Sequence, residues 1–138
     1  MKSPVIDGIQ WIALTVWQEA QGEPYPGKLA VANVIMNRSN EWMKSISDIV
    51  LAKWQFSAWN TDSPTRLSLD SIDSASPVWR GCHKAACSAF YHLEEDPTKG
   101  ALHYLNVDVV RKATGTLPSW FDESKITVII GNHTFLKI

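Results

Sequence analysis

Two glutamates, Glu19 and Glu23, lie at a turn rich in glycine and proline. The residues before Glu19 form an apolar stripe with helical spacing, made of Ile9, Ile12, Ala13, Val16, Trp17 and Ala20. At about 100° per residue, Glu19 falls beside the middle of this stripe, and Gly22 and Pro24 end the helix soon after it. Because a carboxyl at the border of a buried face loses hydration, we expect a raised pKa for Glu19.

A carboxylic acid that keeps its proton near neutral pH can donate it to the leaving oxygen of a sugar, as the general acid of a glycosidase does. The alternative is that Glu19 and Glu23 are ordinary solvated charges flanking a turn, since structural carboxylates are common. Glu23 is the weaker candidate because Gly22 and Pro24 leave its orientation open. It could instead cap the amides that begin the next helix.

The helices that must position these glutamates can be predicted from the apolar pattern. Pro26–Arg38 predicts a helix that is apolar nearly all round, and such a helix is normally central to its domain. A loop is expected over Asn40–Ser47, with Ser47 as the N-cap of a short third helix. A longer helix is predicted from Pro77 to about Glu94.

The last third of the chain predicts strands. Ala101–Asn106 alternates between apolar and polar residues, which places Tyr104 and Asn106 on the same side of a short strand. Two β-rich runs over residues 126–138 flank Gly131-Asn132, the pattern of a β-hairpin. The sheet should therefore be small and antiparallel.

The segment Val107–Ser124 lies between the predicted strands, and we expect it to be a loop anchored by Trp120 and Phe121. No repeat or linker divides the chain. The sequence therefore predicts one α+β domain over residues 1–138, with a mostly helical, lysozyme-like body and a small antiparallel β-sheet.

Composition narrows the function classes. The chain has 138 residues, 45% of them hydrophobic, which is enough for one domain with a real core. A net charge of −1 is not the basic footprint of a nucleic-acid-binding protein, and no apolar run approaches the roughly 20 residues of a membrane span. Cys82 and Cys87 are spaced wrongly for a disulfide within one helix, so we expect two free thiols and a reducing compartment.

A second candidate site is the aromatic segment 53–60. Its rings are interleaved with hydrogen-bonding side chains, in the order Trp54, Gln55, Phe56, Ser57, Trp59 and Asn60. Sugar rings present an apolar face and a rim of hydroxyls, so aromatic plates combined with amides suit them. The alternative is that these rings are part of the core. The polar residues 61–76 that follow could be a flap over the site or a solvated connector.

A resemblance to a known family is carried by the string from Glu19 to Arg38, EAQGEPYPGKLAVANVIMNR. It resembles the signature of the SleB-type cell-wall hydrolases, which include spore cortex-lytic enzymes and bacteriophage endolysins. Further matches follow in order, and they are Gln55-Phe56-Ser57, Asp96-Pro97-Thr98, Gly100-Ala101-Leu102, Tyr104 with Asn106, and Gly131-Asn132-His133-Thr134-Phe135. The resemblance covers nearly the whole chain.

The resemblance implies an enzyme that cuts peptidoglycan glycan strands between N-acetylmuramic acid and N-acetylglucosamine without a cofactor. Glu19 stands at the position of the catalytic acid and would then act as the base. A lytic transglycosylase needs only this carboxyl, because the muramic 6-hydroxyl closes onto the anomeric carbon. A hydrolysing muramidase normally uses a second carboxylate, for which the candidates are Asp48, Asp62, Asp96 and Asp108. The resemblance favours the transglycosylase.

We expect eight residues to bind the substrate: Glu23, Gln55, Phe56, Ser57, Tyr104, Asn106, Trp120 and His133. Tyr104 and Asn106 could hydrogen-bond the N-acetyl groups, and His133 is the histidine best placed for a site, next to the hairpin turn. The chain departs from the family pattern in having His103 before Tyr104 and in lacking a proline after Asn106. The details of the substrate groove are therefore expected to differ.

Two other function classes are alternatives to this one. A zinc amidase that cuts the muramoyl–peptide bond could draw its ligands from His83, His92, His103 and His133, but no HExxH motif or tight spacing supports it. A non-catalytic peptidoglycan-binding module would use the aromatic rings alone. We therefore predict no metal and no cofactor.

The cellular location is also an expectation. Only Lys2 precedes Pro4 and a mixed stretch, which does not predict a signal peptide. We expect a monomer that is kept in the cytoplasm and reaches the cell wall after release by a separate lysis system, as a compact phage endolysin does. A bacterial enzyme of wall maintenance or recycling is the alternative.

Overall fold

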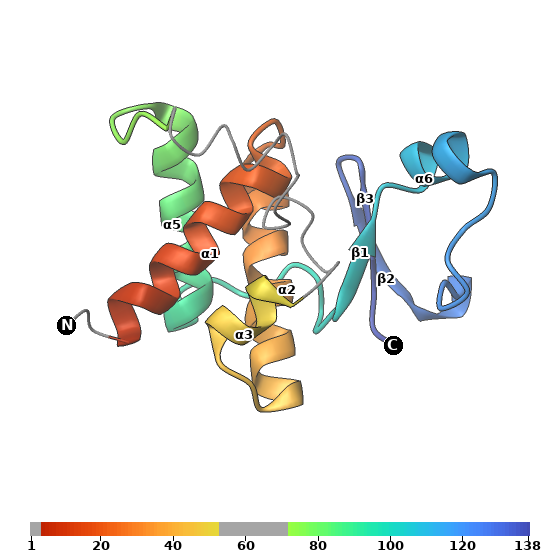
Figure 1. Ribbon diagram of the computed structural model, residues 1–138, viewed down its shortest axis with the longest axis horizontal. Helices are drawn as coiled ribbons and strands as arrows, with labels where there is room; N and C mark the ends of the chain where they lie inside the picture. The colour runs from red at the N-terminus through yellow and green to blue at the C-terminus, as the bar shows by residue number, and fades with distance from the viewer. Residues whose placement is uncertain (1–3, 53–71) are drawn as a thin grey trace.

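A computed structural model describes residues 4–52 and 72–138 of the chain. Its elements, in chain order, are α1 (Pro4–Ala20), α2 (Tyr25–Trp42), α3 (Ile46–Leu51), α5 (Pro77–Tyr91), β1 (His103–Leu105), α6 (Val107–Thr114), the 3-10 helix η3 (Glu123–Lys125), β2 (Ile126–Ile130) and β3 (His133–Leu136) (Figure 1). The predicted fold class is confirmed: a mostly helical body carries a small antiparallel sheet.

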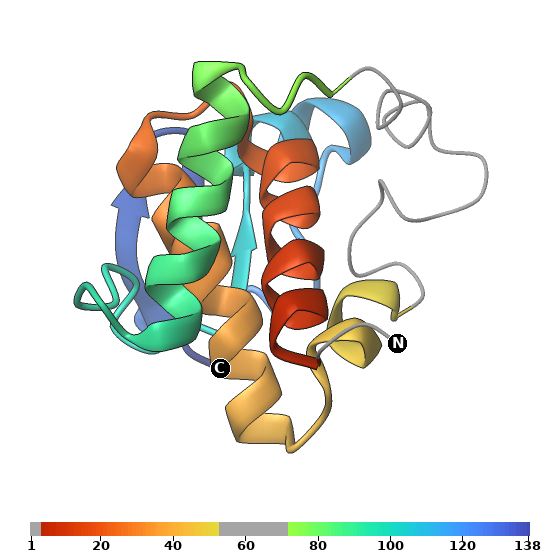
Figure 2. The same ribbon diagram turned by 90° about the vertical axis from the view of Figure 1, so that its left-hand side faces the viewer.

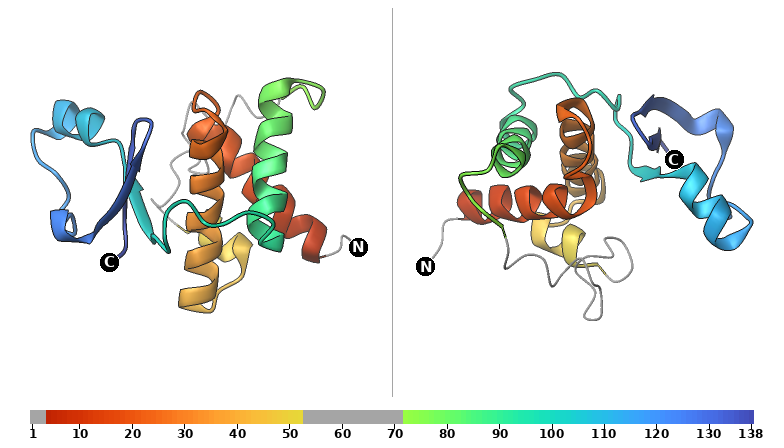
Figure 3. Two further views of the ribbon diagram at one scale, coloured as in Figure 1. Left: turned by 180° about the vertical axis from the view of Figure 1, so that it is seen from behind. Right: turned by 90° about the horizontal axis from the view of Figure 1, so that it is seen from above.

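Helix α2 lies between helices α1 and α5 on one side and the sheet on the other (Figures 1 and 3). Val31 and Ile35 belong to the helical core that α2 shares with α1, α3 and α5. Ala30 and Val34 instead pack against Ala101 and Phe135 on the side of the sheet. The helix is apolar nearly all round because it is covered on both sides, as predicted.

Helices α1 and α5 run side by side over α2 (Figure 2). The apolar stripe of α1 is buried in their common core, with Ile12 and Val16 fully shielded from solvent. Cys82 on α5 is buried and Cys87 is partly buried, and both are free thiols, as predicted. None of the helices within the described ranges is both long and apolar enough to cross a membrane.

The sheet has the strand order β1-β3-β2, and both pairings are antiparallel. The predicted hairpin is confirmed, with Gly131-Asn132 between β2 and β3. Gly131 has a φ of 57°, and glycine with positive φ at the first central position is the feature of a type II′ turn. Tyr104 pairs with Phe135 across β1 and β3, so the central strand fixes the position of β1.

Two predicted boundaries around α2 and α3 are wrong. Helix α2 continues to Trp42 and ends at Met43 in the left-handed conformation, whereas a loop was predicted from Asn40. No helix-breaking residue interrupts this stretch, and Arg38 stacks on Trp42 one turn further along. The N-cap of α3 is Ser45 and not Ser47, because the Ser45 hydroxyl accepts a hydrogen bond from the amide of Asp48 at 3.2 Å.

The predicted loop over Val107–Ser124 is also wrong, since it contains α6 and η3. Asn106 caps α6 by accepting a hydrogen bond from the amide of Val109 at 3.1 Å. Gly115 ends the helix with a φ of 79°. The α5 helix is shorter than predicted and ends at Tyr91, with His92 in the left-handed conformation.

Several predictions fall outside the described residues. The predicted substrate-binding residues Gln55, Phe56 and Ser57 are among them, as is Asp62. Of the predicted polar segment 61–76, only residues 72–76 are described, and there Ser76 caps α5 by accepting a hydrogen bond from the amide of Trp79 at 3.1 Å.

Candidate active site

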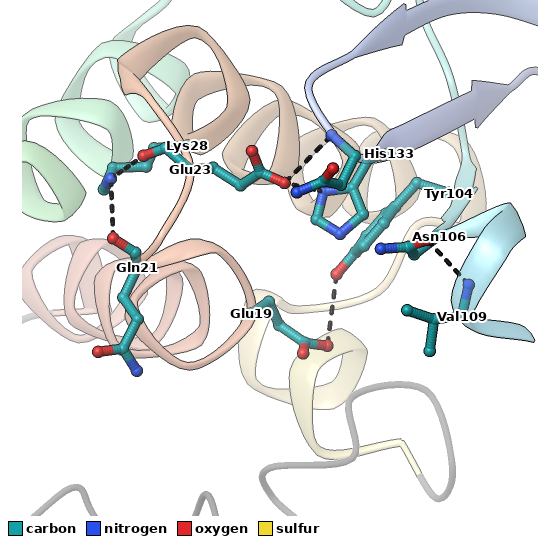
Figure 4. A network of polar contacts seen from close by, with 9 residues as sticks. Glu19, Gln21, Glu23, Lys28, Tyr104, Asn106, Val109 and His133 are labelled. Carbon is teal, nitrogen blue, oxygen red and sulfur yellow. Dashed lines mark hydrogen bonds and ion pairs between the residues drawn. The ribbon is translucent and has the colours of Figure 1, made fainter. Parts of the chain in front are cut away.

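Glu19 lies in the last turn of α1, where its side chain points toward Tyr104 of β1 (Figure 4). The Tyr104 hydroxyl donates a hydrogen bond to Glu19 Oε1 at 3.3 Å. Burial raises the pKa of Glu19, and the bond from Tyr104 and the charge of Arg38 only partly oppose it. The raised pKa predicted from the apolar stripe is therefore present in the fold.

Tyr104 is partly buried and packs against both apolar cores. Burial, followed by the charge of Glu19, raises the pKa of its hydroxyl well above the ordinary value, so it stays protonated and acts as a hydrogen-bond donor. Its ring packs beside Phe135 at 5.6 Å between centroids and meets the edge of the His133 ring at 5.0 Å. These contacts hold the hydroxyl toward Glu19 from the side of the sheet.

Arg38 ties the strand that carries Tyr104 to α2. Its Nε donates a hydrogen bond to the carbonyl oxygen of Leu102 at 2.6 Å, two residues before Tyr104. Burial lowers the pKa of this guanidinium, while Tyr104 and Glu19 raise it. Arg38 thus provides a buried positive charge in the neighbourhood of Glu19.

The turn before β1 is organised by Asp96. Its Oδ1 accepts hydrogen bonds from the amide of Thr98 at 2.8 Å and from the Thr98 hydroxyl at 2.7 Å. Its Oδ2 accepts from the amide of Gly100 at 3.0 Å and from Asn37 Nδ2 at 2.9 Å. Burial raises the pKa of Asp96, yet these hydrogen bonds outweigh it and leave the pKa lowered. Asp96 is therefore a structural carboxylate and is not available as a second catalytic group.

Glu23 faces the β-hairpin across the site (Figure 4). Its Oε1 accepts a hydrogen bond from the amide of Asn132 at 3.3 Å and lies 3.7 Å from His133 Nδ1. Only 10% of its side chain is exposed. The idea that Glu23 caps α2 is wrong, because the N-cap is Pro24 and has no side-chain cap. Glu23 instead joins the α1–α2 turn to the hairpin.

His133 links Glu23 to Tyr104. Burial lowers the pKa of His133, and the nearby Glu23 carboxylate opposes this shift. The imidazole touches Tyr104 edge-on, so a row of side chains runs from Glu23 through His133 and Tyr104 to Glu19 (Figure 4). Sequence reasoning selected all four residues but did not predict this order.

Lys28 was missed by sequence reasoning. It is buried on α2, with 7% exposed, and its ammonium group donates to the carbonyl oxygens of Gln21, at 3.2 Å, and of Glu23. These bonds hold the α1–α2 turn that orients both glutamates. A lysine early in an otherwise apolar helix was the available signal.

Two predicted site residues lie differently from the expectation. Asn106 was predicted to lie in the same strand as Tyr104, but β1 ends at Leu105 and Asn106 is the N-cap of α6. Its Oδ1 accepts the capping hydrogen bond. Its amide nitrogen makes no hydrogen bond to another residue of the described ranges. Trp120 packs on His103, with ring centroids 5.0 Å apart, and not against Glu19.

In the part of the chain that the structure describes, the remaining carboxylates and the histidines do not form a cluster that could bind a metal. Asp48 and Asp108 are exposed in the first turns of α3 and α6. Across residues 4–52 and 72–138, no three His, Cys, Asp or Glu side chains are placed to hold a metal ion together. In the described part of the chain, Glu19 is the candidate carboxyl whose pKa is raised.

The chain is similar in sequence to known cell wall hydrolases. The family model for cell wall hydrolases matches residues 22–136, beginning just after Glu19. The spore cortex-lytic enzyme of Bacillus subtilis is 29% identical over 135 residues, which cover 94% of this chain and 37% of that protein. The same enzyme of Oceanobacillus iheyensis is 30% identical over 131 residues, covering 94% of this chain and 41% of that protein. The chain thus spans less than half the length of these relatives.

Two solved structures share the fold over almost the whole chain. The catalytic domain of the Bacillus cereus SleB protein has a TM-score of 0.66 and 29% identity, covering 96% of this chain and 91% of that one. The catalytic domain of the germination-specific lytic transglycosylase SleB from Bacillus anthracis has a TM-score of 0.65 and 28% identity, covering 95% and 94%. Together with the family model, these likenesses show that the chain belongs to the cell wall hydrolase family, of the SleB type.

Proposed function

We propose that this chain cleaves the β-1,4 bond between N-acetylmuramic acid and N-acetylglucosamine in peptidoglycan, with Glu19 as general acid and then base. The observation that carries the proposal is the partly buried Glu19 carboxyl, with a raised pKa and a hydrogen bond from Tyr104. The names of the similar solved domains, one of them a lytic transglycosylase, support the same reaction.

In the first step Glu19 gives its proton to the bridging oxygen as the glycosidic bond breaks. Positive charge develops at the anomeric carbon of the muramic acid. The carboxylate that remains is stabilised by the hydrogen bond from Tyr104 and by the charge of Arg38, both of which favour the ionised form. The same contacts therefore help most when the proton has left, which is when catalysis needs them.

In the second step the Glu19 carboxylate takes the proton of the muramic 6-hydroxyl, whose oxygen bonds to the anomeric carbon. The products are a chain ending in 1,6-anhydro-muramic acid and a chain with a free N-acetylglucosamine 4-hydroxyl, and Glu19 has regained its proton. This route needs one carboxyl. It is supported by the engagement of Asp96 in a turn and of Glu23 with the hairpin.

The substrate-binding assignments remain proposals. Gln55, Phe56 and Ser57 are proposed from the family pattern alone. For Asn106, the amide NH₂ is the group left to bind an N-acetyl carbonyl, because its oxygen caps α6. Glu23 and His133 are proposed to act mainly by supporting Tyr104, since their polar groups face each other and the hairpin.

Digestion of purified peptidoglycan tests the proposal. Wild-type, Glu19→Gln and EDTA-treated protein are incubated with the polymer, and the released fragments are identified by mass spectrometry. Anhydro-muropeptides that are lost only in Glu19→Gln are expected. Reducing muramic ends would indicate hydrolysis, whereas free peptides lost on chelation would indicate an amidase. Binding without any product would indicate a non-catalytic module.

We also propose that the protein acts as a monomer and stays in a reducing cytoplasm until a separate lysis system releases it. The two free thiols, Cys82 and Cys87, support a reducing compartment. Lysis of a test bacterium is expected when the chain is directed to the periplasm and not when it is retained in the cytoplasm. Lysis from the cytoplasm without any helper would contradict this proposal.

A further inference from the structure

The tryptophans of the chain fall into two groups. Of the seven, Trp54 and Trp59 lie outside the described residues, and Trp11, Trp17 and Trp79 pack in or against the helical core. Trp42 and Trp120 differ, because each keeps 38% of its surface exposed. A single exposed ring is ordinary on a protein surface, whereas exposed rings that lie together can mark a binding site.

Both exposed tryptophans flank the same residue, His103. The Trp42 and His103 rings are 6.2 Å apart between centroids, and the His103 and Trp120 rings are 5.0 Å apart and tilted by 33°. The three rings come from the end of α2, from β1 and from the segment between α6 and η3. Elements far apart in the sequence thus assemble one row of rings.

This row adjoins the neighbourhood of Glu19. His103 directly precedes Tyr104, which hydrogen-bonds to Glu19. The Arg38 guanidinium lies 5.4 Å from the centre of the Trp42 ring, and its charge acts on both Glu19 and His103. Burial, followed by that charge, lowers the pKa of His103, so the row is uncharged at neutral pH.

We propose that Trp42, His103 and Trp120 form an aromatic platform on which a sugar ring of the glycan strand stacks, at a subsite beyond the two sugars of the scissile bond. The inference rests on the proposed function, since it assigns the occupant of the platform to the same polymer that reaches Glu19. A pyranose ring offers a flat face of C–H groups to an aromatic ring. The half-exposed tryptophans provide such rings without a charge that would have to be desolvated.

Continuity with Glu19 is the reason for choosing a glycan strand as the occupant. A polymer whose bond is cut at Glu19 must extend away from it, and Arg38, whose charge acts on Glu19, lies 5.4 Å from the Trp42 ring of the platform. A contact at this distance should matter for long strands and be irrelevant for fragments too short to reach it. Strand length is therefore the variable that separates a subsite from simple packing of the α6–η3 segment.

The test uses Glu19→Gln protein, which should bind glycan without cutting it. The probes are peptide-free peptidoglycan glycan strands, separated into disaccharide, tetrasaccharide and octasaccharide fractions, and the dissociation constants are measured by calorimetry. Trp120→Leu and Trp42→Leu are expected to weaken octasaccharide binding by about three- to tenfold, the range that one aromatic contact supplies. Disaccharide binding should be unchanged.

Control variants separate stacking from folding. Trp120→Phe retains an aromatic ring and should keep most of the octasaccharide affinity, whereas Trp120→Leu preserves only apolar packing. Tyr91→Leu removes a ring that is 54% exposed on α5, and it should leave the affinity unchanged. Thermal melts show whether each variant is folded.

The proposal is overturned if, in the Glu19→Gln protein, Trp120→Leu leaves the affinity for octasaccharide unchanged. It is also overturned if Trp120→Leu weakens the binding of disaccharide, tetrasaccharide and octasaccharide to the same extent. Failure of the proposed function is distinguishable from this. In that case the protein with Glu19 intact releases no glycan product, whether or not the fractions bind. If the protein cleaves glycan strands, but Trp42→Leu and Trp120→Leu do not change its preference for long strands, the aromatic platform alone is wrong.

Discussion

Replacing Gly131 by alanine should show how firmly Glu23 is held. A Cβ added at Gly131 would lie 2.5 Å from Glu23 Oε2, a distance that the two atoms cannot keep. Gly131 also has a φ of 57°, where an L-residue is strained by about 1–2 kcal/mol. The alanine must therefore displace the Glu23 carboxylate as well as strain the turn.

The magnitude follows from these two contributions. Displacing Glu23 removes its hydrogen bond from Asn132, and a bond to a charged group is worth about 1.5–3 kcal/mol. We therefore expect Gly131→Ala to lower the free energy of unfolding by about 2.5–5 kcal/mol in total. Gly115 is the matched control, because its φ is 79° and, apart from its chain neighbours, no atom of the described residues lies within 4 Å of an added Cβ. Gly115→Ala should cost only about 1–2 kcal/mol.

Urea unfolding of Gly131→Ala, Gly115→Ala, Glu23→Ala and the Glu23→Ala/Gly131→Ala double variant measures these differences. Without the Glu23 carboxylate, the alanine at position 131 should cost less than it does in the otherwise unchanged protein, so the two substitutions should be strongly non-additive. Equal destabilisation by Gly131→Ala and Gly115→Ala in the otherwise unchanged protein would refute the reasoning.

The remaining predictions concern Glu19, Tyr104 and α2. Glu19→Gln should reduce cleavage by about 10²–10⁴-fold while leaving the melting temperature equal or slightly higher. Because the pKa of Glu19 is raised in the fold, cleavage should fall as pH rises through that pKa. The folded protein binds this proton more tightly than the unfolded chain, so the free energy of unfolding should also decrease as pH rises from the unfolded to the folded pKa of Glu19. Urea unfolding at several pH values should show this decrease in the wild-type protein and not in Glu19→Gln. Tyr104→Phe removes the donor to Glu19 and should lower kcat by about tenfold, with little change in KM, in a steady-state assay. Val34→Asp places an unpaired charge at a fully buried site and should abolish cooperative unfolding seen by circular dichroism.

Much of the fold follows from patterns within single segments. The helical spacing before Glu19, the all-round apolar character of α2 and the Gly131-Asn132 turn each predict their element because the cause is local. Helix α6 was missed although Asn106 and Gly115 are good caps, because three of its eight residues are valines, which favour strands, and none of its residues is buried.

The candidate site was predicted in part of its members and not in its connections. Glu19, Glu23, Tyr104 and His133 were selected from spacing and resemblance, but the contacts that link them join segments far apart in the chain, as the pair of Glu23 and His133 does. The role of Asp96 as the centre of a turn was also hidden, because its partners on α2 and around Gly100 meet only in the folded chain. Distances of this kind depend on packing, which single-segment patterns do not encode.

The central place of α2 has a consequence for when the protein can act. Glu19 belongs to the helical side of α2 and Tyr104 to the sheet side, 85 residues later in the chain. A newly made chain would have no working acid until its C-terminal hairpin had closed onto the helices. Local opening of the sheet should likewise silence the enzyme while the helices stay folded, and one proteolytic cut beyond Leu105 would have the same effect.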